Sequence, residues 1–426
     1  MKILILIEIS SLGGHVLSAI TTGKELKKRG HEVHFAGGPG PMENAIRETF
    51  NFTHLPFFYN HGSRQTYFTW KSLKTLRELT KLSDRLAPDH IHAFDARSYI
   101  LASMLGIQNK LPVTGTLCGG ITPYYNIPLS GELIVFSPEQ KDKLMNVYSW
   151  KQDNIAVISS RLDMEQFSVS RNEADEFCRN HDIDSNRKNI FMITNFLGPK
   201  IAAIRHVLDA VHPVLKKYSD AGMVFIGSRG EFFHEAKDIG ERINLFLGRD
   251  AVHFTGAVMQ AHRFLPSAFA VLGVGRSAFE GMANMKPTLI VGEHGYAGTV
   301  GKDNITEISY FNFSGRNNKI SHPPSVLSQE LERLFTDAAY YDQSKAFGRD
   351  YLKAHIDIKS GISRIENVYE SNRSFTKRTS FLKRVFNLLK VLSVIILDNY
   401  YNQGKQIIQK FIGLIRHAND RSSPST

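Results

Sequence analysis

The sequence has little cysteine and no long hydrophobic run. Its 426 residues include two cysteines, Cys118 and Cys178, which lie 60 residues apart and form no CxxC pair, and Cys178 with His181 is their one CxxH pair. This excludes a disulfide framework and a cysteine-based zinc site, and it favours a reducing, cytosolic compartment. No stretch reaches the roughly 18 uninterrupted apolar residues that a membrane-spanning helix needs. Glu8 interrupts MKILILIEIS after five apolar residues, so these residues predict a buried strand rather than a signal peptide.

Two common nucleotide-binding motifs are also absent. The sequence contains neither the GxGxxG dinucleotide fingerprint nor the GxxxxGK[ST] phosphate loop. Classical NAD chemistry and P-loop chemistry therefore lose support. No repeat of fixed period occurs along the chain.

Positive charge is concentrated near the C-terminus. The formal net charge is +11, and residues 371–426 contain ten Lys or Arg against two Asp, which gives +8 and leaves +3 for the first 370 residues. This asymmetry predicts that the C-terminal segment meets an anionic surface.

Apolar, strand-like runs alternate with helical segments, which predicts an α/β fold with parallel sheets. The first strand is followed by a glycine turn, a helical segment and a second strand through Val33 and Phe35. Two open α/β halves are expected, joined near residues 160–188. The expected strands are 2–9, 29–38, 90–94, 111–117 and 132–137 in the first half, and 189–196, 221–228, 251–258, 269–275 and 287–292 in the second.

The loops after these strands are the candidate ligand-binding segments. In open parallel sheets, ligands bind beyond the carboxyl ends of the strands, where backbone N–H groups and helix N-termini face an anion. The loop SLGGH follows the first strand. Gly13 and Gly14 would let the backbone approach a phosphate, with His15 at the helix N-terminus. A purely structural strand-to-helix bend is the alternative.

Two loops of the second half also carry candidates. TNFLGPK contains Asn195 and Lys200, and FIGSRGE contains Gly227 and Arg229 in a glycine turn. Lys200 would face a diphosphate, although a solvated surface lysine is the alternative.

The stretch GVGRSAFEG places charges in an apolar run. Gly275, Arg276 and Ser277 form the expected turn, and Glu280 follows in the helix. A carboxylate there is favoured by the helix dipole, which is the structural explanation. The functional explanation is that Glu280 accepts hydrogen bonds from ribose hydroxyls while Arg276 and the helix N-terminus face a diphosphate.

Candidate general bases come from the first half of the chain. They are His15, His92 and Asp95, the last two in the stretch HIHAFDA. His92 is equally well explained as a hydrogen-bonded core histidine, and Asp95 as the N-cap of the following helix.

These loops together resemble the GT-B glycosyltransferases. SLGGHVLSAITTGKELKKRGHEVHFAGG is similar to the opening of the N-acetylglucosaminyltransferases that form lipid II, whereas RLDMEQF, LGPK and RSAFEGMANMKPTLIV resemble the retaining glycosyltransferase family 4. The resemblance covers about residues 1–300. It implies two Rossmann-like, doubly wound domains facing across a cleft. The expected division is an acceptor domain (1–165), a nucleotide-sugar domain (166–350), a closing helix (351–370) and a basic amphipathic tail (371–426).

The resemblance also implies residue roles. Glu280 matches the carboxylate that holds the nucleotide ribose, Lys200 matches the lysine that faces the donor diphosphate, and Gly13, Gly14 and His15 match the loop near the reacting centre. It implies a nucleotide-sugar substrate and no metal or other cofactor.

Three positions depart from the family pattern. Leu272 stands where a second Glu is usual, Asn195 where an Arg is usual, and Cys118 where a His is usual. Leu272 and Cys118 put a retaining mechanism in question, so an inverting mechanism is an open alternative. Arg276 and Arg229 are the candidates to supply the missing cation.

Basic amphipathic segments predict contact with an anionic membrane surface. The tail segments 381–397 and 407–417 combine aliphatic side chains with Lys and Arg, as interfacial helices do. Packing on the catalytic domains or on a partner chain is the alternative. The helical segment 70–86 also has a basic side, with a solvated face as its alternative. Nucleic acid fits less well, because the basic residues alternate with aliphatic rather than stacking aromatic ones.

The sequence therefore predicts a cytoplasmic, peripheral membrane glycosyltransferase. Its acceptor would be a lipid-linked or polysaccharide substrate of the cell envelope. The alternatives are a UDP-sugar 2-epimerase of the same fold and an inactive GT-B-like subunit that binds membrane and a partner.

Overall fold

The computed structural model divides the chain into two compact units. The first comprises Met1–Val135, Lys143–Ala156 and the chain from Ser363 onward, and the second comprises Phe136–Asp142 and Val157–Ile362. The residues that the structure describes are 1–57, 72–119, 127–167, 170–198, 200–258, 260–318, 322–397 and 401.

The first unit is built on a seven-stranded sheet. Its strand order is β3-β2-β1-β4-β5-β6-β7, and the pairings from β1 through β6 are parallel. Because β1 and β4 are neighbours in the middle, the chain leaves them in opposite directions and creates a switch point at their carboxyl ends. The strands are β1 (Lys2–Ile9), β2 (Glu32–Gly38), β3 (Asn51–His54), β4 (His90–Ala93), β5 (Val113–Leu117), β6 (Leu133–Val135) and β7 (Ile155–Val157).

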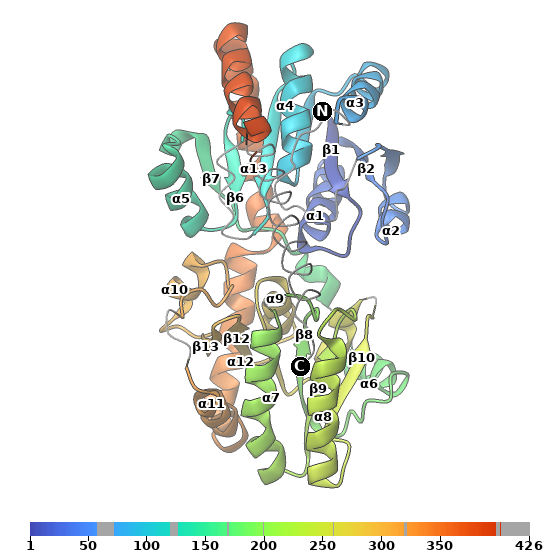
Figure 1. Ribbon diagram of the computed structural model, residues 1–426, viewed down its shortest axis with the longest axis vertical. Helices are drawn as coiled ribbons and strands as arrows, with labels where there is room; N and C mark the ends of the chain where they lie inside the picture. The colour runs from blue at the N-terminus through green and yellow to red at the C-terminus, as the bar shows by residue number, and fades with distance from the viewer. Residues whose placement is uncertain are drawn as a thin grey trace, which may run out of the picture. The chain divides into compact units, whose positions relative to one another are not determined.

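Helix α4 is the central helix of this unit. It packs on β1, β4 and β5, and it is flanked by α3 and by a helix at residues 381–397, coloured orange-red in Figure 1. The helices that begin or end in this unit are α1 (Gly14–Lys28), α2 (Glu43–Arg47), α3 (Ser72–Leu86), α4 (Ala96–Gln108), α5 (Pro138–Tyr148) and α13 (Ile358–Arg378), with the short 3₁₀ helix η1 (Gln152–Asn154).

The end of α13 returns to the first sheet. Tyr369 is buried and its ring lies 4.3 Å from that of His90 in β4, measured between centroids. Asn372 is also buried and donates from Nδ2 to Thr114 Oγ1 in β5 at 2.8 Å. The end of α13 therefore completes the core of the unit that the N-terminal strands began.

The second unit is built on a six-stranded sheet. Its order is β10-β9-β8-β11-β12-β13, with a switch point between the neighbours β8 and β11, and only the hairpin partner β13 among these strands is antiparallel. The strands are β8 (Lys188–Ile193), β9 (Ala221–Ile226), β10 (Val252–Gly256), β11 (Ala270–Gly273), β12 (Thr288–Gly292) and β13 (Gly295–Thr299).

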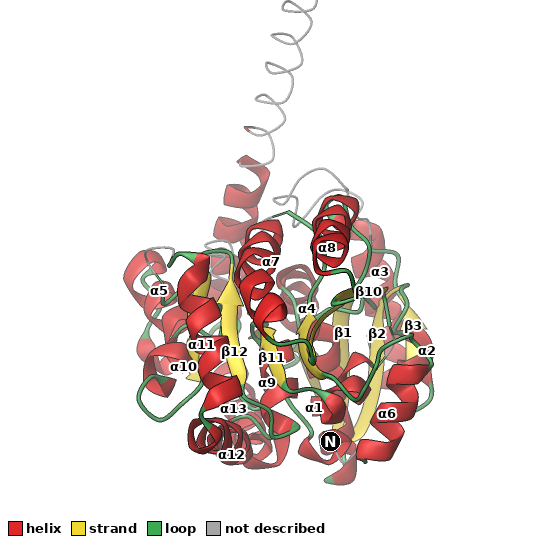
Figure 2. Ribbon diagram, turned by 90° about the horizontal axis from the view of Figure 1, so that it is seen from below, coloured by secondary structure: helices red, strands yellow, loops and turns green. Residues whose placement is uncertain are grey.

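Alternating strand residues fill two apolar cores in this unit. Leu272 packs with α7 and α11 on one face, whereas its neighbour Val271 packs with Cys178 and Phe264 on the other. Helices α7 and α11 lie side by side over the β12–β13 side of the sheet (Figure 2). The helices are α6 (Arg171–Arg179), α7 (Lys200–Lys217), α8 (Phe233–Leu247), α9 (Arg276–Ala283), α10 (Ile305–Tyr310), α11 (Pro324–Thr336) and α12 (Ala338–His355), with the 3₁₀ helices η2 (Met164–Phe167) and η3 (Ala261–Ser267).

The two doubly wound α/β units confirm the predicted fold class, and all ten expected strands are present. Three strands were not expected, namely β3, β7 and β13. The predicted helix at 381–397 is also present. The segment 407–417 and the first two residues of 70–86 lie outside the described residues. Within the described part of the chain, every helix is too short or too polar to cross a membrane.

Candidate functional site at the two switch points

The turn after β11 depends on a glycine. Gly275 has φ 54° and ψ −120°, a conformation that strongly favours glycine, and its N–H donates to Phe313 O at 2.7 Å. Ser277 completes the turn, because its Oγ lies 3.0 Å from Val274 O and 3.2 Å from Val274 N. Ser277 therefore serves the turn, and the turn starts α9 at Arg276.

Arg276 and Glu280 form an ion pair on α9. Their spacing places them one helical turn apart, and Arg276 Nε donates to Glu280 Oε1 at 3.0 Å. The two side chains are only 18 and 12% exposed. A guanidinium and a carboxylate held together at the carboxyl end of a central strand can bind a diphosphate and a pair of hydroxyls, respectively.

His262 was not expected at this site. It belongs to η3, which follows β10, and its ring meets that of Phe167 edge-on at 5.4 Å between centroids. Burial lowers the pKa of His262, and the nearby Glu280 carboxylate opposes that shift. Only this neighbourhood, which the sequence does not reveal, makes His262 a candidate for contact with the same ligand as Glu280.

Lys200 begins α7, directly after the other central strand, β8. Burial lowers the pKa of its ammonium group, and the carboxylate of Glu293, which follows β12, opposes that shift. The side chain of Lys200 is only partly exposed, so it is less solvated than an ordinary surface lysine. Lys200 lies at the carboxyl edge of the same sheet as Arg276, and a partly buried cation beside a helix N-terminus is suited to an anion.

The other candidate residues of the second unit lie at the same carboxyl edge of the sheet, but they differ in whether a ligand can reach them. Asn195 is exposed after β8. Gly227 lets the loop after β9 pack directly on the loop after β8, since a Cβ at this position would lie 1.4 Å from Thr194 O. Arg229 is exposed, with its guanidinium 5.1 Å from the centroid of the Phe233 ring. Gly227 is thus required by backbone packing, whereas Asn195 and Arg229 are accessible to a ligand.

In the first unit, the glycine loop shapes the position of His15. Gly13 is the N-cap of α1, and a Cβ at Gly13 would lie 2.8 Å from ring atoms of His15. The His15 ring therefore occupies space that a side chain at position 13 would fill, so this position requires glycine. Position 14 has no such requirement, because a Cβ at Gly14 would meet open space. Burial lowers the pKa of His15, and Asp95 opposes that shift. A neutral imidazole is the form that can accept a proton.

Asp95 joins the two central strands of the first sheet. Its Oδ1 accepts from Ser98 N at 2.8 Å, which caps α4, and its Oδ2 accepts from Glu8 N at the end of β1 at 2.7 Å. The structural explanation as an N-cap is therefore correct. The same carboxylate also opposes the lowering of the pKa of His15.

Glu8 is a further candidate that the sequence did not identify as a site residue. It forms an ion pair with Arg97, and the side chains are 16 and 11% exposed. Burial and the neighbouring Asp95 raise the pKa of Glu8 to about 7, against the opposing effect of Arg97. The signal was its position as the one charged residue inside an apolar strand.

His92 has a structural role, which corrects its assignment as a base. The residue is fully buried, with Nδ1 2.8 Å from Tyr369 Oη and Nε2 2.7 Å from Thr116 Oγ1. Burial lowers its pKa to about 3. Both ring nitrogens are occupied, so an acceptor hydroxyl cannot reach them.

Two of the departures from the family pattern also have clear positions. Leu272 is fully buried in β11 and packs in the core beside α7. Cys118 follows β5 and is partly exposed. The side chain at position 272 therefore contributes to the core and offers no contact to a donor sugar.

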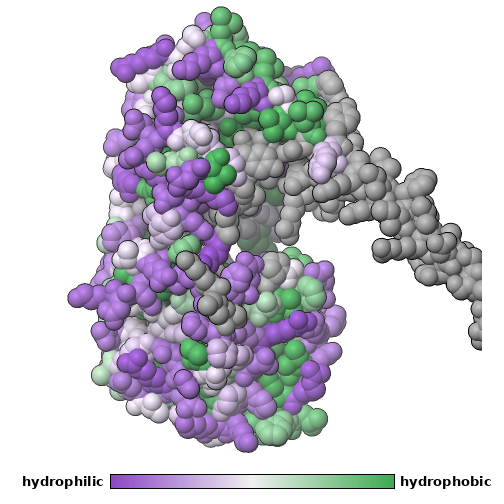
Figure 3. Space-filling view, turned by 60° about the vertical axis from the view of Figure 1, so that its left-hand side comes forward, coloured by the Kyte–Doolittle hydropathy of each residue, from purple (hydrophilic) through white to green (hydrophobic). Residues whose placement is uncertain are grey.

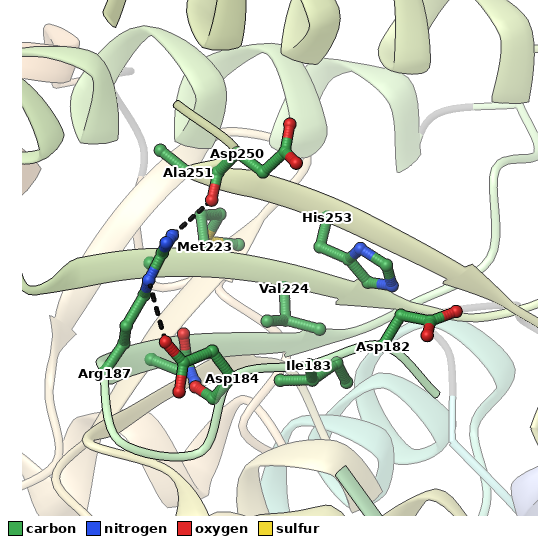
Figure 4. A pocket seen from close by; sticks show the side chains of 11 residues that line it. Asp182, Ile183, Asp184, Arg187, Met223, Val224, Asp250, Ala251 and His253 are labelled. Atoms are coloured by element: carbon green, nitrogen blue, oxygen red, sulfur yellow. Dashed lines mark hydrogen bonds and ion pairs between the residues drawn. The ribbon is translucent and has the colours of Figure 1, made fainter. Parts of the chain in front are cut away.

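A cavity of about 200 Å³ lies at the opposite, amino-terminal edge of the second sheet (Figure 4). Arg187 spans part of it, pairing with Asp184 at 3.3 Å and donating to Asp250 O. Because the cavity lies near the starts of β8, β9 and β10, it is separate from the loops described above.

The N-terminal part of the sequence matches a known family, and the fold matches solved structures. Residues 2–163 match the family described as glycosyl transferase 4-like. A glycosyltransferase from Rickettsia africae has 16% identity and a TM-score of 0.65, with 89% of this chain and 99% of that chain covered. The Anabaena protein Alr3699/HepE, solved in complex with UDP-glucose, has 13% identity and a TM-score of 0.64, covering 87% and 100%.

Epimerases share the fold as well. The UDP-GlcNAc 2-epimerase from Neisseria meningitidis, bound to UDP-GlcNAc, has 15% identity and a TM-score of 0.56, covering 86% and 98%. No curated protein matches the sequence. The resemblance to GT-B glycosyltransferases is confirmed in the fold of the chain and, over residues 2–163, in its sequence.

Proposed function

We propose that this protein is a glycosyltransferase with a nucleotide-sugar donor, because residues 2–163 match the glycosyl transferase 4-like family and the chain has the GT-B fold. The observation that carries the proposal is the Arg276–Glu280 pair at the carboxyl end of β11. It stands at the switch point of the second sheet, where open α/β sheets bind nucleotides.

In this proposal, cations and helix N-termini stabilise the leaving diphosphate. Lys200 begins α7 and Arg276 begins α9, and these helices follow the two central strands. Positive groups that are already oriented toward the developing charge lower the barrier to departure of the nucleoside diphosphate. Arg229 is the candidate for a third, solvent-side contact.

Glu280 would accept hydrogen bonds from the two ribose hydroxyls. Its Oε1 already accepts from Arg276 Nε, and each carboxylate oxygen has further acceptor capacity. Arg276 would thereby orient the carboxylate toward the ribose and present its remaining N–H groups to the phosphates.

The proposed base is His15, assisted by Asp95. Deprotonation of an acceptor hydroxyl by His15 leaves an imidazolium, which the Asp95 carboxylate stabilises. The sugar would then be transferred with inversion at the anomeric carbon. The buried Leu272 supports this choice, because a retaining enzyme of the family would usually have a glutamate there.

We further propose that the reaction needs no metal ion and takes place on the cytoplasmic face of a membrane. The cations at the switch point supply the charge that a metal would otherwise provide. The acceptor would be a lipid-linked or polysaccharide substrate of the cell envelope, and the basic C-terminal segment supports this location.

Ligand-induced thermal stabilisation tests the donor site. UDP, GDP and ADP sugars would be added to the wild type, to Glu280→Ala and to the control Glu307→Ala in α10. UDP is the first nucleotide to test, because the Anabaena and Neisseria proteins were solved with UDP-sugars. We expect one nucleotide family to raise the melting temperature of the wild type and the control, and less so that of Glu280→Ala. Well-folded protein that responds to no nucleotide would refute the donor site.

An epimerase of the same fold is the second candidate, favoured by the fold shared with the Neisseria enzyme. An epimerase would convert the sugar nucleotide with no acceptor present. Incubation of the stabilising nucleotide sugar alone, followed by NMR of the sugar, separates the two activities. Nucleotide binding without turnover, with any acceptor or none, would indicate an inactive subunit.

A further inference from the structure

The helix at residues 381–397 has one face fixed to the first unit. Leu388, Val391 and Ile395 are buried, and the last two pack with Ile100 of α4. Arg384 is only 5% exposed and donates from Nη2 to Gly106 O at 2.9 Å, at the end of α4. This face is therefore held by an apolar contact and a charge-assisted hydrogen bond.

The opposite face is exposed and, apart from Ser393, apolar. Leu382 is 76% exposed, Phe386 75%, Leu389 58% and Leu397 67%. Spacings of four, three and eight residues place these side chains on one side of a helix, about half a turn from the buried face. Figure 3 shows hydrophobic residues in green at the top of the view, the end of the first unit where Figure 1 places this helix.

Such a face is unusual for a helix whose outer side is exposed to water. A helix that is apolar all round is normally buried, and contiguous apolar surface on a soluble protein marks an interaction site. Helix α3, on the other side of α4, differs, since Leu73 is its one large hydrophobic residue that is strongly exposed. The helix at 381–397, rather than α3, is therefore the element that needs a partner.

The positive charge around the apolar face indicates which kind of partner covers it. Residues 371–397 contain six Lys or Arg and no Asp or Glu. Lys383 and Lys390 are exposed on the same helix, beside the apolar face. A second copy of the chain, docked by the same face, would bring like charges together. An anionic bilayer satisfies both properties, because its headgroups attract lysine and its acyl boundary accepts apolar side chains.

We propose that the outward face of the helix at 381–397 inserts into the interface of an anionic membrane while its inward face stays on α4. The helix would lie parallel to the bilayer surface, with Phe386 and Leu389 buried among lipids and Lys383 and Lys390 at headgroup level. This deepens the peripheral location proposed above by naming the surface, and it requires no nucleotide sugar.

Sedimentation with lipid vesicles tests the proposal. The full-length protein would be mixed with vesicles of phosphatidylcholine alone or with added phosphatidylglycerol. The variant Phe386→Ser/Leu389→Ser removes two inserted side chains. The matched control, Leu245→Ser/Phe246→Ser on α8, removes an equally exposed Leu and Phe, at 85 and 61%, from the second unit.

We expect the wild type and the control to bind the anionic vesicles, and the helix variant to bind at least about 100-fold more weakly, given the transfer energy of two large apolar side chains. Lys383→Gln/Lys390→Gln should weaken binding by roughly tenfold or more and flatten its salt dependence. Unchanged circular dichroism and nucleotide-induced stabilisation in both variants would show that the fold and the donor site are intact.

Three outcomes would overturn the proposal. They are no binding of the wild type to anionic vesicles, equal binding to neutral vesicles, and equal loss in the control and the helix variants. A dimer in sedimentation velocity that dissociates in Phe386→Ser/Leu389→Ser would assign the face to a second copy instead. Failure of nucleotide binding would leave these results unaffected, so this proposal and the proposed function can fail separately.

Discussion

The buried carboxyl group of Glu8 makes protein stability depend on pH in a defined direction. The folded state raises its pKa from the usual 4.5 to about 7, because burial and Asp95 disfavour the charged form. Between these two values the folded chain holds a proton that the unfolded chain has released. The free energy of unfolding must therefore fall as the pH rises from about 4.5 to about 7.

The size of this effect follows from the shift. One pKa unit corresponds to about 1.4 kcal/mol, so a shift of this size weakens the folded state by about 3 kcal/mol at pH 8 relative to pH 4. Glu8→Gln removes the titration while keeping the shape of the side chain. Its uncharged amide escapes the burial cost and the repulsion from Asp95, although it pairs less well with Arg97.

Urea unfolding of the wild type and Glu8→Gln across this pH range measures the effect. Other titrating groups cancel in the difference between the two proteins. We expect the variant to gain stability relative to the wild type as the pH rises, by about 3 kcal/mol in total and mostly below pH 7. A flat difference for Glu8→Gln, or one of the opposite sign, would refute the argument.

Three further predictions concern the proposed reaction and its scaffold. His15→Gln should lower kcat by about 10²- to 10⁴-fold while nucleotide-induced stabilisation is retained, and an unchanged kcat would exclude His15 as the base. Gly227→Ala should lower the free energy of unfolding by about 1–3 kcal/mol in urea, because its Cβ would collide with Thr194 O, whereas the control Gly301→Ala has space and should change little. Addition of EDTA during an activity assay should leave the initial rate unchanged, and a loss that Mg²⁺ restores would contradict the metal-independent proposal.

The sequence predicted the strands of both sheets because their signals are local. Buried parallel strands are short apolar runs bounded by Gly, Pro or helical segments, and β1 and β12 have this form. Two of the three missed strands lack it, and the third, β7, is an apolar run of only three residues, IAV. β3 is NFTH and β13 is GYAGT, and both contain too few apolar residues to stand out. Their positions beside other strands come from tertiary pairing.

The site was predicted less completely, because it depends on which strand ends become neighbours. The glycine turns at Gly13 and Gly275 and the charges that follow them are visible as motifs. Glu8, His262 and Glu293 belong to the same two edges only because of the strand order. His92 shows the converse, since its motif suggested chemistry while its partner Tyr369 comes from a helix 277 residues away in the chain.

The charges at the two switch points are not explained by folding alone. A largely buried ion pair contributes little net stability, and apolar residues of similar size often serve as well or better. Leu272, in the strand that leads to Arg276 and Glu280, shows that this sheet accommodates an ordinary apolar residue close to the site. Charged groups that the fold does not require, at the edge where such sheets bind ligands, are best explained by a ligand that offsets their desolvation. The helix at 381–397 is the inverse case. Its outward Leu and Phe side chains gain nothing from exposure to water, so the same reasoning assigns them to a partner that buries them.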